Sequence, residues 1–407
     1  MAKRFIGIDL NDKYAMISYY TRGMSEPGTY STVTGSESYQ IPVCISKKEG
    51  EDYWFFGEHA RTYAAEEGVF CVDGLLRKAL AEEKVELEET LYEASELLFL
   101  FLNDLICLPL QLGEETQVDR LVITVEYMNL ELRNLFGLFA ERIALPADRL
   151  LLLDYRESFY YYALSQTPEL CSRDVVLYYY TSKKLFCWRL SHDRQTIPQV
   201  VTIAETRYES MLRVQDEEFA VIAEGTLSGQ PVSAVYLIGD GFDGGWMKKS
   251  LAAICQGRRA FMGKNLFSKG ACYGAAVKSG QIVWQYVYMG DNEVKVNVGL
   301  KVVNNGETEF LTLINAGDNW YEAGGEWEVI LGGSPALDLY FQPPDGAEAM
   351  VRSLILTDLP KREDRTTRLR ICVKPVAADQ IGFSIRDLGF GEIVKSSDRI
   401  WEHIVKV

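Results

Sequence analysis

Phe5-Ile-Gly-Ile-Asp-Leu-Asn-Asp-Lys13 and Val235-Tyr-Leu-Ile-Gly-Asp-Gly241 are the two stretches that most directly indicate the fold of this chain. Each is a short apolar run, typical of a buried strand, that ends in small or acidic residues. Open α/β sheets hold their ligands beyond the carboxyl ends of such strands. The two stretches therefore predict an α/β domain with a ligand site where both strands end.

The first half of the chain alternates strand and helix patterns. Two apolar runs around Asn11-Asp-Lys13 predict a hairpin. Apolar periodicity predicts strands over 39–48, 53–57, 120–125 and 149–153, and helices over 58–67, 86–108, 129–143 and 155–165. A βαβα alternation of this kind favours a parallel or mixed sheet.

The second half begins with a similar pattern and then changes. Strands are expected from Asp174 and from Leu185, followed by helices over 214–227, 245–256 and 268–278 and a strand over 233–238. Beyond about residue 285, short strands alternate with turn residues, which is typical of an antiparallel β-sandwich. We therefore predict a two-lobed domain over 1–284, with lobes at 1–170 and 171–284, and a β-sandwich over 285–407.

The composition excludes several classes of partner. The 407 residues carry a net charge of -16, which repels nucleic acids and anionic membrane surfaces. The eight cysteines are widely spaced and only three histidines are present, so neither a metal centre nor a disulfide framework is expected. The chain reaches Asp9 too soon for a secretion signal. We expect a cytoplasmic protein with reduced thiols.

A series of short motifs runs through nearly the whole chain: Ile6-Gly-Ile-Asp-Leu10, Gln40-Ile-Pro-Val43, Phe56-Gly-Glu-His-Ala60, Gly68-Val-Phe70, Val122-Ile-Thr-Val125, Val235-Tyr-Leu-Ile-Gly239, Tyr273-Gly-Ala-Ala276, Leu356-Thr-Asp-Leu-Pro360, Arg368-Leu-Arg-Ile-Cys-Val373 and Ile381-Gly-Phe-Ser-Ile385. In this order they resemble the motifs of the DnaK-type heat-shock chaperones, which belong to the actin-like ATPase superfamily. The resemblance implies an α/β actin-like (ribonuclease-H-like) two-lobed nucleotide-binding domain followed by a peptide-binding β-sandwich. It also implies ATP or ADP with magnesium as cofactor.

The first phosphate-binding turn of that family is only partly retained. Asp9 matches the aspartate that orients magnesium-bound water, and Asn11 can adopt the left-handed backbone geometry of the glycine that it replaces. Asp12 stands where the family has a hydroxyl. A carboxylate about 4 Å from a phosphate oxygen costs roughly 4 kcal/mol at an effective dielectric constant near 20. The alternative interpretation is that Asp12 caps a solvated hairpin turn.

The second phosphate-binding turn departs further from the family. Asp174 is the candidate for a second carboxylate toward magnesium-bound water, but bulky residues follow it and would keep the backbone away from a phosphate. Lys183 and Lys184 are candidate cationic phosphate ligands, or are simply solvated at a hairpin tip. Glu157 falls near the family's N-E-P-T motif. The resemblance implies no side chain that binds the metal directly.

The nucleoside side of the predicted site is better retained. Gly239, Asp240 and Gly241 end a buried strand in a flat turn on which a base or ribose can lie. The adenine-covering subdomain is reduced, and Asp73 occupies the register of the family's catalytic lysine. ATP or ADP with magnesium is therefore expected to bind weakly. The aromatic runs 159–162 and 178–180 are predicted to pack between the lobes.

Three functions are compatible with these patterns. The first is a chaperone-like protein that binds a protein partner or an extended peptide and has lost ATP hydrolysis. The second is a divergent but active ATPase that uses Lys183 or Lys184, and the third is an actin-like scaffold or filament protein. The chain stops soon after Ser397-Asp-Arg-Ile-Trp-Glu402, where at most two helical turns are expected, so we expect no helical lid over the sandwich.

Overall fold

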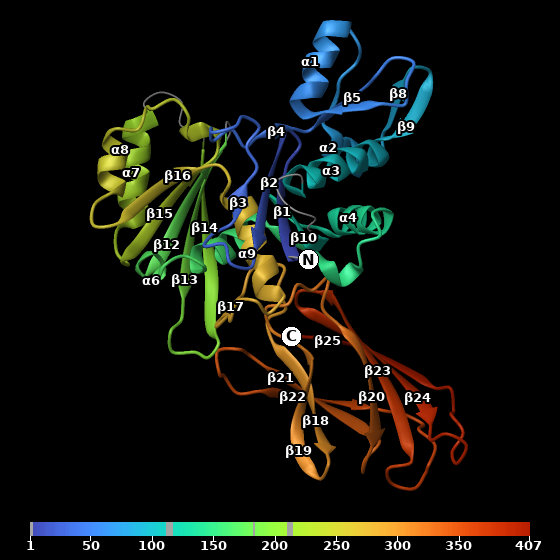
Figure 1. Ribbon diagram of the computed structural model, residues 1–407. Coiled ribbons are helices and arrows are strands. Elements are labelled where there is room, and N and C mark those ends of the chain that lie inside the picture. Colours follow the sequence, from blue (N-terminus) through green and yellow to red (C-terminus); the bar gives the residue numbers. More distant parts are fainter. Residues whose placement is uncertain (1–2, 111–116, 182–183, 210–214) are drawn as a thin grey trace. The chain divides into compact units, whose positions relative to one another are not determined.

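The computed structural model of the protein describes residues 3–110, 117–181, 184–209 and 215–407 (Figure 1). The chain divides into two compact units. The first unit combines Met1–Leu190 with Ala204–Trp284, and the second combines Ser191–Ile203 with Gln285–Val407. The architecture is mixed α/β in the first unit, and within the described residues the second unit is built from strands.

The first sheet is built on the N-terminal hairpin that the sequence predicts. Its strands follow the order β11-β10-β1-β2-β3, and β4 (Ile41–Pro42) pairs with β2 beside them. The strands β1 and β2 are antiparallel, as are β2 and β3, whereas β10 and β11 run parallel to β1. Their bounds are β1 Lys3–Leu10, β2 Tyr14–Thr21, β3 Gly28–Thr29, β10 Gln117–Val125 and β11 Leu150–Asp154.

The second sheet repeats this plan. Its order is β16-β15-β12-β13-β14-β17, with β15 parallel to β12 and β16 parallel to β15. The bounds are β12 Asp174–Tyr180, β13 Lys184–His192, β14 Gln199–Glu209, β15 Val232–Ile238, β16 Arg259–Gly263 and β17 Tyr286–Tyr288. In both sheets three consecutive strands lie side by side and two later parallel strands extend the sheet from the first of the three.

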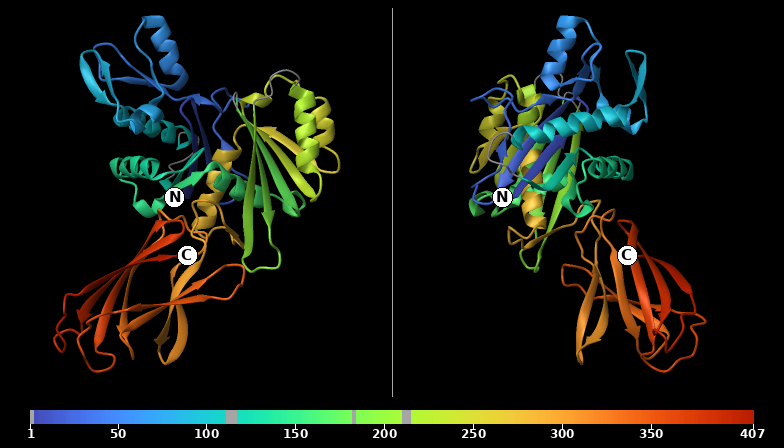
Figure 2. Two further views of the ribbon diagram at one scale, coloured as in Figure 1. Left: turned by 180° about the vertical axis from the view of Figure 1, so that it is seen from behind. Right: turned by 45° about the vertical axis from the view of Figure 1, so that its right-hand side comes forward.

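Helices cover these sheets. The helix α9 packs against β1, β2 and β10 and also crosses α5, whereas α3 and α4 contact β2 and β11 of the same sheet (Figure 2). The helices α7 and α8 contact each other, and their apolar side chains join the core of the second sheet. The bounds are α3 Ala94–Leu110, α4 Leu130–Arg142, α5 Tyr155–Leu164, α6 Pro168–Cys171, α7 Gln215–Leu227, α8 Lys249–Ile254 and α9 Leu266–Lys278. Within the described residues, none of the helices is long and apolar enough to cross a membrane.

A smaller group of elements follows β4. A three-stranded sheet orders β6-β5-β7, and α1 packs on β5. The predicted helix over 86–108 is wrong in its first part, because residues 84–93 form a hairpin and the helix begins only at Ala94. The turn residues Glu88 and Glu89 both have positive φ, a conformation that glutamate rarely adopts and that leaves no turn signal in the sequence. The bounds are β5 Cys44–Lys47, β6 Trp54–Phe56, α1 Gly57–Glu67, β7 Val72–Asp73, α2 Leu75–Leu80, β8 Lys84–Leu87 and β9 Thr90–Glu93.

Two four-stranded sheets dominate the second unit and share one apolar core. We name them the β22 sheet, ordered β19-β18-β21-β22, and the β25 sheet, ordered β20-β23-β24-β25. The helical turns expected near the end of the chain are wrong: Ile400–Lys406 form strand β25, because Trp401 is buried opposite Ile385 of β24. The other bounds are β18 Asn297–Asn304, β19 Glu307–Ile314, β20 Gly325–Leu331, β21 Ala336–Gln342, β22 Met350–Ile355, β23 Thr367–Ala377 and β24 Gln380–Gly389.

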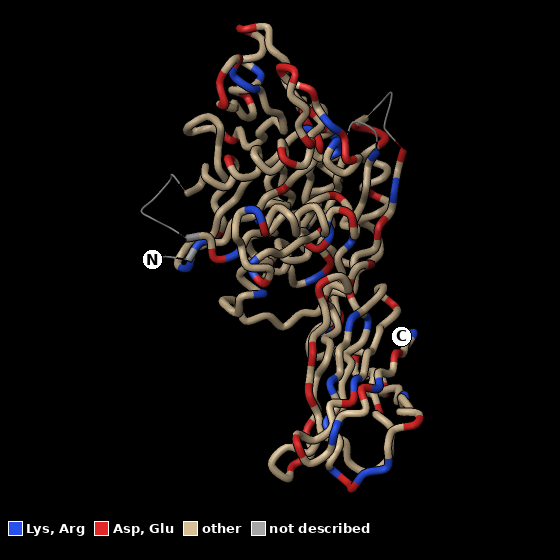
Figure 3. Tube along the Cα trace, turned by 90° about the vertical axis from the view of Figure 1, so that its right-hand side faces the viewer, with Lys and Arg blue, Asp and Glu red and all other residues tan. Residues whose placement is uncertain are grey.

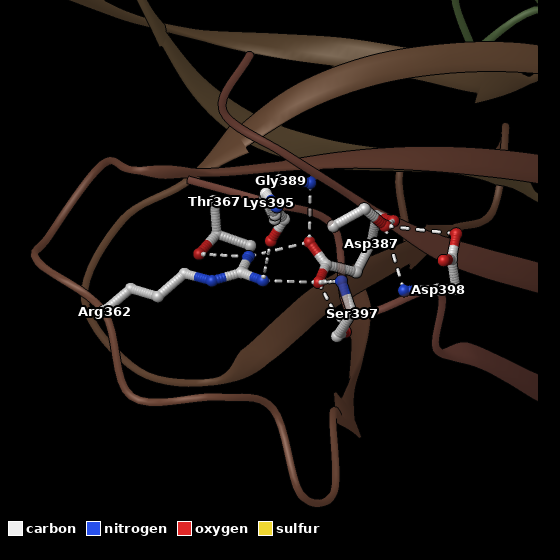
Figure 4. Close-up of polar contacts among 8 residues, drawn as sticks. Arg362, Thr367, Asp387, Gly389, Lys395, Ser397 and Asp398 are labelled. Carbon is white, nitrogen blue, oxygen red and sulfur yellow. Dashed lines mark hydrogen bonds and ion pairs between the residues drawn. The ribbon is translucent and has the colours of Figure 1, made fainter. Parts of the chain in front are cut away.

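A buried ion pair fixes the loops at one end of the β25 sheet (Figure 4). Both carboxylate oxygens of Asp387 accept hydrogen bonds from the Arg362 guanidinium, at 2.8 and 2.7 Å. The backbone N–H groups of Gly389 and Ser397 donate to the same carboxylate at 2.9 and 2.8 Å. Burial alone would raise the pKa of Asp387, but the hydrogen bonds from Arg362, Ser397 and Gly389 hold it well below its usual range.

Candidate functional site

The carboxyl end of β1, where the sequence places the ligand site, holds a buried carboxylate. Asp9 is only 2% exposed, and the Tyr155 hydroxyl donates a hydrogen bond of 2.6 Å to its Oδ1 atom. Burial raises the pKa of Asp9 to about 7, although the hydrogen bond from Tyr155 opposes this shift. A carboxyl group that is neutral in about half of the molecules at pH 7 attracts magnesium-bound water less than a fully ionised one.

Aromatic side chains pack around Tyr155. We name Tyr155, Tyr179, Phe186, Trp188 and Phe267 the interlobe aromatic cluster, since they come from α5, β12, β13 and α9. The Phe267 ring stacks on the Tyr155 ring with centroids 4.0 Å apart and planes inclined by 5°. Tyr179 meets the Tyr155 ring edge-on at 5.7 Å and lies 5.9 Å from the Trp188 ring. The space next to Asp9 is thus packed with bulky rings.

The alternation of β12 explains how Tyr179 enters this cluster. Side chains of successive strand residues point to opposite faces of a sheet. Tyr178 and Tyr180 therefore pack on the face covered by α7 and η2 (Asp240–Phe242), against Phe219 and Phe242. The prediction that the whole run 178–180 packs between the lobes is correct only for Tyr179.

The turn after Asp9 is built for local hydrogen bonding. Asn11 Oδ1 accepts hydrogen bonds of 2.9 Å from the backbone N–H groups of both Lys13 and Tyr14. Asn11 does not take the left-handed conformation expected of it, because its side chain closes the turn instead. Asp12 Oδ1 accepts a 3.0 Å hydrogen bond from the backbone N–H of Arg77 in the first turn of α2. This supports the capping interpretation of Asp12, although the capped element is a helix rather than the hairpin itself.

Asp174 lies far from Asp9. It is the first residue of β12 and pairs with Val232 at the start of β15. Tyr179, which reaches Tyr155, lies five residues further along, or roughly 16 Å at about 3.3 Å per residue. Asp174 Oδ2 instead accepts a 3.0 Å hydrogen bond from Arg189. The structure therefore does not bring the two candidate magnesium-water carboxylates together.

Of the two candidate phosphate-binding lysines, only Lys184 lies within the described residues. Lys183 lies outside the described residues. Lys184 is exposed, and its backbone closes a turn with the Thr181 hydroxyl at 3.2 Å. Its ammonium acts on Glu126: burial and the nearby Glu205 raise the pKa of Glu126, while Arg207 and Lys184 oppose the shift. The charge of Lys184 is thus felt at Glu126, but no ion pair joins the two among the described residues.

The turn predicted to carry the nucleoside, residues 239–241, packs against Tyr180. Gly239 has φ +110, and a Cβ atom there would lie 2.3 Å from the Tyr180 carbonyl oxygen. A Cβ atom on Gly241 would lie 2.3 Å from the Tyr180 ring. These glycines therefore allow close packing on Tyr180. Asp240 is exposed and accepts a 3.2 Å hydrogen bond from Gln40 and a 3.4 Å contact from Lys264.

Sequence reasoning missed the residues that dominate this region. The sequence-predicted Glu157 is buried in the first turn of α5, where its backbone N–H donates a 2.8 Å hydrogen bond to Asp154 Oδ1, but it is not one of these residues. Tyr155, two residues earlier, and Phe267 carry the contacts with Asp9 and with each other. A usable signal was present: Tyr155 directly follows strand β11 at the same sheet edge as Asp9, where small residues are expected around a phosphate.

The chain matches the profiles of two protein families. It belongs to the family described as "Family of unknown function (DUF5716) C-terminal", whose profile matches residues 26–291. The remaining part, residues 293–407, matches the profile described as "Domain of unknown function (DUF8552)". No curated protein matches the chain.

Proposed function

We propose that the protein is a chaperone-like binding protein whose actin-like domain has lost ATP hydrolysis and whose β-sandwich holds extended segments of a protein partner. Two features support the actin-like assignment. The strands β1–β3, β10 and β11 follow the same plan as β12–β16, and the crossing helices α5 and α9 contact both sheets, the second one through Phe159 on Tyr236 and Phe267 on Tyr179. The proposal includes a cytoplasmic location and no nucleic acid or membrane partner, in keeping with the net charge of -16.

The nucleotide side of the proposal depends on the interlobe aromatic cluster. A phosphate tail near Asp9 would have to displace the stacked pair Tyr155 and Phe267. It would also have to break the 2.6 Å hydrogen bond between Tyr155 and Asp9. Burial of aromatic side chains of this size is worth several kcal/mol, so this displacement opposes binding. Binding of ATP or ADP with magnesium is accordingly weak.

The observation that carries the binding function is a difference between the outer faces of the two sandwich sheets. On the β25 sheet, Leu369 and Ile371 are buried, so Arg368 and Arg370 of the same strand point outward. Arg370 forms ion pairs with Glu328 at 2.9 Å and with Glu326 at 3.0 Å. Acidic and basic residues are interspersed along the strands of this unit (Figure 3). Ion-paired charges therefore occupy the middle of the outer face of the β25 sheet, and the exposed Ile330, Ile400 and Ile404 lie on its edge strands.

The outer face of the β22 sheet differs in that it carries a pair of aromatic rings among its aliphatic side chains. We name the exposed side chains Val303, Phe310, Val351 and Ile355, together with the half-buried Tyr340, the β22 face. Val351 pairs with Tyr340 across β22 and β21, and the Phe310 and Tyr340 rings meet edge-on at 6.1 Å. The exposed fractions of Phe310, Val351 and Ile355 are 41%, 48% and 61%. Exposed apolar clusters of this kind mark interaction sites.

A glycine keeps the β22 face open. Gly299 lies beneath the Phe310 ring, because a Cβ atom there would be 2.3 Å from that ring. The Lys301 ammonium stands 4.6 Å from the centre of the Tyr340 ring. Aromatic rings spread over a sheet in this way offer flat apolar surface to an extended segment.

The edge strand β22 of the same sheet is open to pairing with an added strand from a partner. The other edge strands carry acidic residues: Glu307 and Glu309 on β19, Glu326 and Glu328 on β20, and Glu402 on β25. Charges on edge strands discourage pairing with another chain. The only charged residue of strand β22 is Arg352. It is exposed, and it has no ion pair among the described residues. An extended apolar peptide with one acidic residue therefore fits this edge.

Val351→Asp tests the binding function, with Ile330→Asp as its matched control. Both are exposed aliphatic residues on edge strands, at 48% and 54%, but they belong to different sheets. Binding of a fluorescein-labelled extended peptide of apolar residues with one glutamate is measured by fluorescence anisotropy. We expect Val351→Asp to weaken binding by about tenfold or more, equivalent to about 1.4 kcal/mol, and Ile330→Asp to change it less than twofold.

Two results would count against this function. The first is an absence of peptide binding by the wild-type protein at millimolar concentration. The second is equal weakening by both variants, which would remove the β22 face from the binding surface. The same titration with magnesium and ATP present tests the alternative of an active ATPase, because an ATP-driven chaperone would change its peptide affinity. Sedimentation at increasing protein concentration tests the alternative of a filament protein.

A further inference from the structure

Two cysteines meet in the small three-stranded sheet beside α1. Cys44 opens strand β5 and pairs with Asp73 of β7, and Ile45 pairs with Val72. Because these strands are antiparallel, the next residue before β7, Cys71, comes beside Ser46 and on the same face as Cys44. The register therefore places the two thiols next to each other on one face of the small sheet. Both thiols are free in this structure.

The two thiols differ in access. Cys44 is 1% exposed, and its Sγ atom lies 3.3 Å from the carbonyl oxygen of Gly57 at the start of α1. Ser46 Oγ donates to the carbonyl of Ala60 in the same helix at 3.1 Å, which shows that this face of β5 packs on α1. Cys71 is partly exposed. A reagent from solution therefore reaches Cys71 first.

The surroundings favour a thiolate at Cys71. The neighbouring Cys44 thiol lowers the pKa of Cys71 to about 6, assisted by Ser46 and by the Arg61 guanidinium, against the opposing effect of burial. The same contact with Cys71, together with burial, raises the pKa of Cys44. The partly exposed sulfur is thus the nucleophile and the buried one is its proton-bearing neighbour.

We propose that Cys44 and Cys71 form a redox-active thiol pair that is oxidised to a disulfide by a small-molecule disulfide such as glutathione disulfide. The Cys71 thiolate attacks one sulfur of the reagent, forms a mixed disulfide and releases one thiolate. Cys44 then loses its proton and attacks the Cys71 sulfur, and the second thiolate leaves. The balance is one protein dithiol plus one disulfide giving one protein disulfide plus two thiols.

The arrangement separates this pair from the other cysteines. Of the other six, Cys171, Cys187 and Cys272 are buried, Cys372 is partly exposed, and Cys107 and Cys255 are exposed, none with a neighbouring cysteine of opposite access on the same sheet face within the described residues. The new bond would close a loop over residues 45–70, which contains β6 and α1, and would tie β5 to the segment before β7. Oxidation would therefore stiffen this small sheet and the helix on it without involving the interlobe aromatic cluster.

The test uses the full-length reduced protein in a buffer containing glutathione and glutathione disulfide. After the remaining thiols are blocked, peptide mass spectrometry identifies the cross-links. We expect an intramolecular Cys44–Cys71 disulfide in most molecules of the wild type. In Cys44→Ser we expect a stable mixed disulfide between glutathione and Cys71, and in Cys71→Ser we expect neither product. Iodoacetamide at pH 6.5 should modify Cys71 at least tenfold faster than Cys255 in the unoxidised protein.

Two results would overturn the proposal. One is a wild-type protein without the Cys44–Cys71 cross-link in which glutathione reaches Cys71 no more than it reaches Cys255. The other is a disulfide at Cys71 that joins two chains instead of Cys44 of the same chain. Circular dichroism of the serine variants checks that both are folded, and the alkylation rates of the wild type test the proposal independently of any variant.

Discussion

Gly270→Ala is expected to destabilise the first unit by about 3 kcal/mol or more, because α9 crosses α5 in backbone contact at this residue. A Cβ atom on Gly270 would lie 2.1 Å from the carbonyl oxygen of Ser158 and 2.8 Å from its carbonyl carbon. Neither atom can move without shifting α5, whose first residue, Tyr155, covers Asp9. The change should therefore loosen the interlobe aromatic cluster as well as the helix crossing.

Gly137→Ala is the matched control for this variant. Gly137 also lies inside a helix, α4, but a Cβ atom there meets nothing within 4 Å. Alanine is about 1 kcal/mol better than glycine in a helix interior, so Gly137→Ala should be stabilising or neutral. Urea unfolding followed by far-UV circular dichroism reports on the helices, which within the described residues all lie in the first unit. Equal stability of the two variants would contradict the close crossing of α5 and α9.

Arg362→Met is expected to destabilise the second unit by about 3–5 kcal/mol, because it leaves the buried Asp387 carboxylate without its cation. The side chains of Arg362 and Asp387 are 8% and 0% exposed. Arg370→Met is the matched control, since Arg370 is 39% exposed in the charged face of the β25 sheet and its loss should cost about 1 kcal/mol or less. The stabilities of the two variants are compared by urea unfolding followed by tryptophan fluorescence, which reports on Trp401 among other tryptophans.

Acidification should reduce the difference between the wild type and Arg362→Met. The folded-state pKa of Asp387 is depressed below its unfolded value of about 4, so its stabilising contribution is complete above about pH 4 and is lost as the pH falls further. A difference that stays constant from neutral pH to pH 2, or an Arg370→Met variant as unstable as Arg362→Met, would show that the Arg362–Asp387 pair does not hold these loops.

Much of the fold could be predicted from apolar periodicity and turn residues. The hairpin at Asn11 and the strand at 120–125 lie where the patterns place them, because each has an apolar run bounded by an ordinary turn or helix signal. The hairpin at Glu88 and Glu89 could not be predicted, because two glutamates in positive-φ geometry resemble a charged helix face. At β25, tertiary pairing with β24 overrides a sequence that is compatible with helix.

The candidate site was harder to predict, because it depends on the direction and end of each strand. Asp174 has the residue type of a magnesium-water ligand, yet it begins β12 whereas Asp9 lies near the end of β1. The register of two strands in different sheets cannot be obtained from local pattern alone. Tyr155 and Phe267 are separated by more than a hundred residues, and only the packing of α5 on α9 brings their rings together.

The central claim is that aromatic side chains occupy the position next to Asp9 where a nucleotide would place its phosphates. Calorimetric titration of the wild-type protein with ATP and with ADP, each with and without magnesium, tests it most directly. We expect no binding tighter than about 100 μM, equivalent to about 5.5 kcal/mol of binding free energy, and no gain from magnesium. A magnesium-dependent dissociation constant of about 10 μM or lower would contradict the claim.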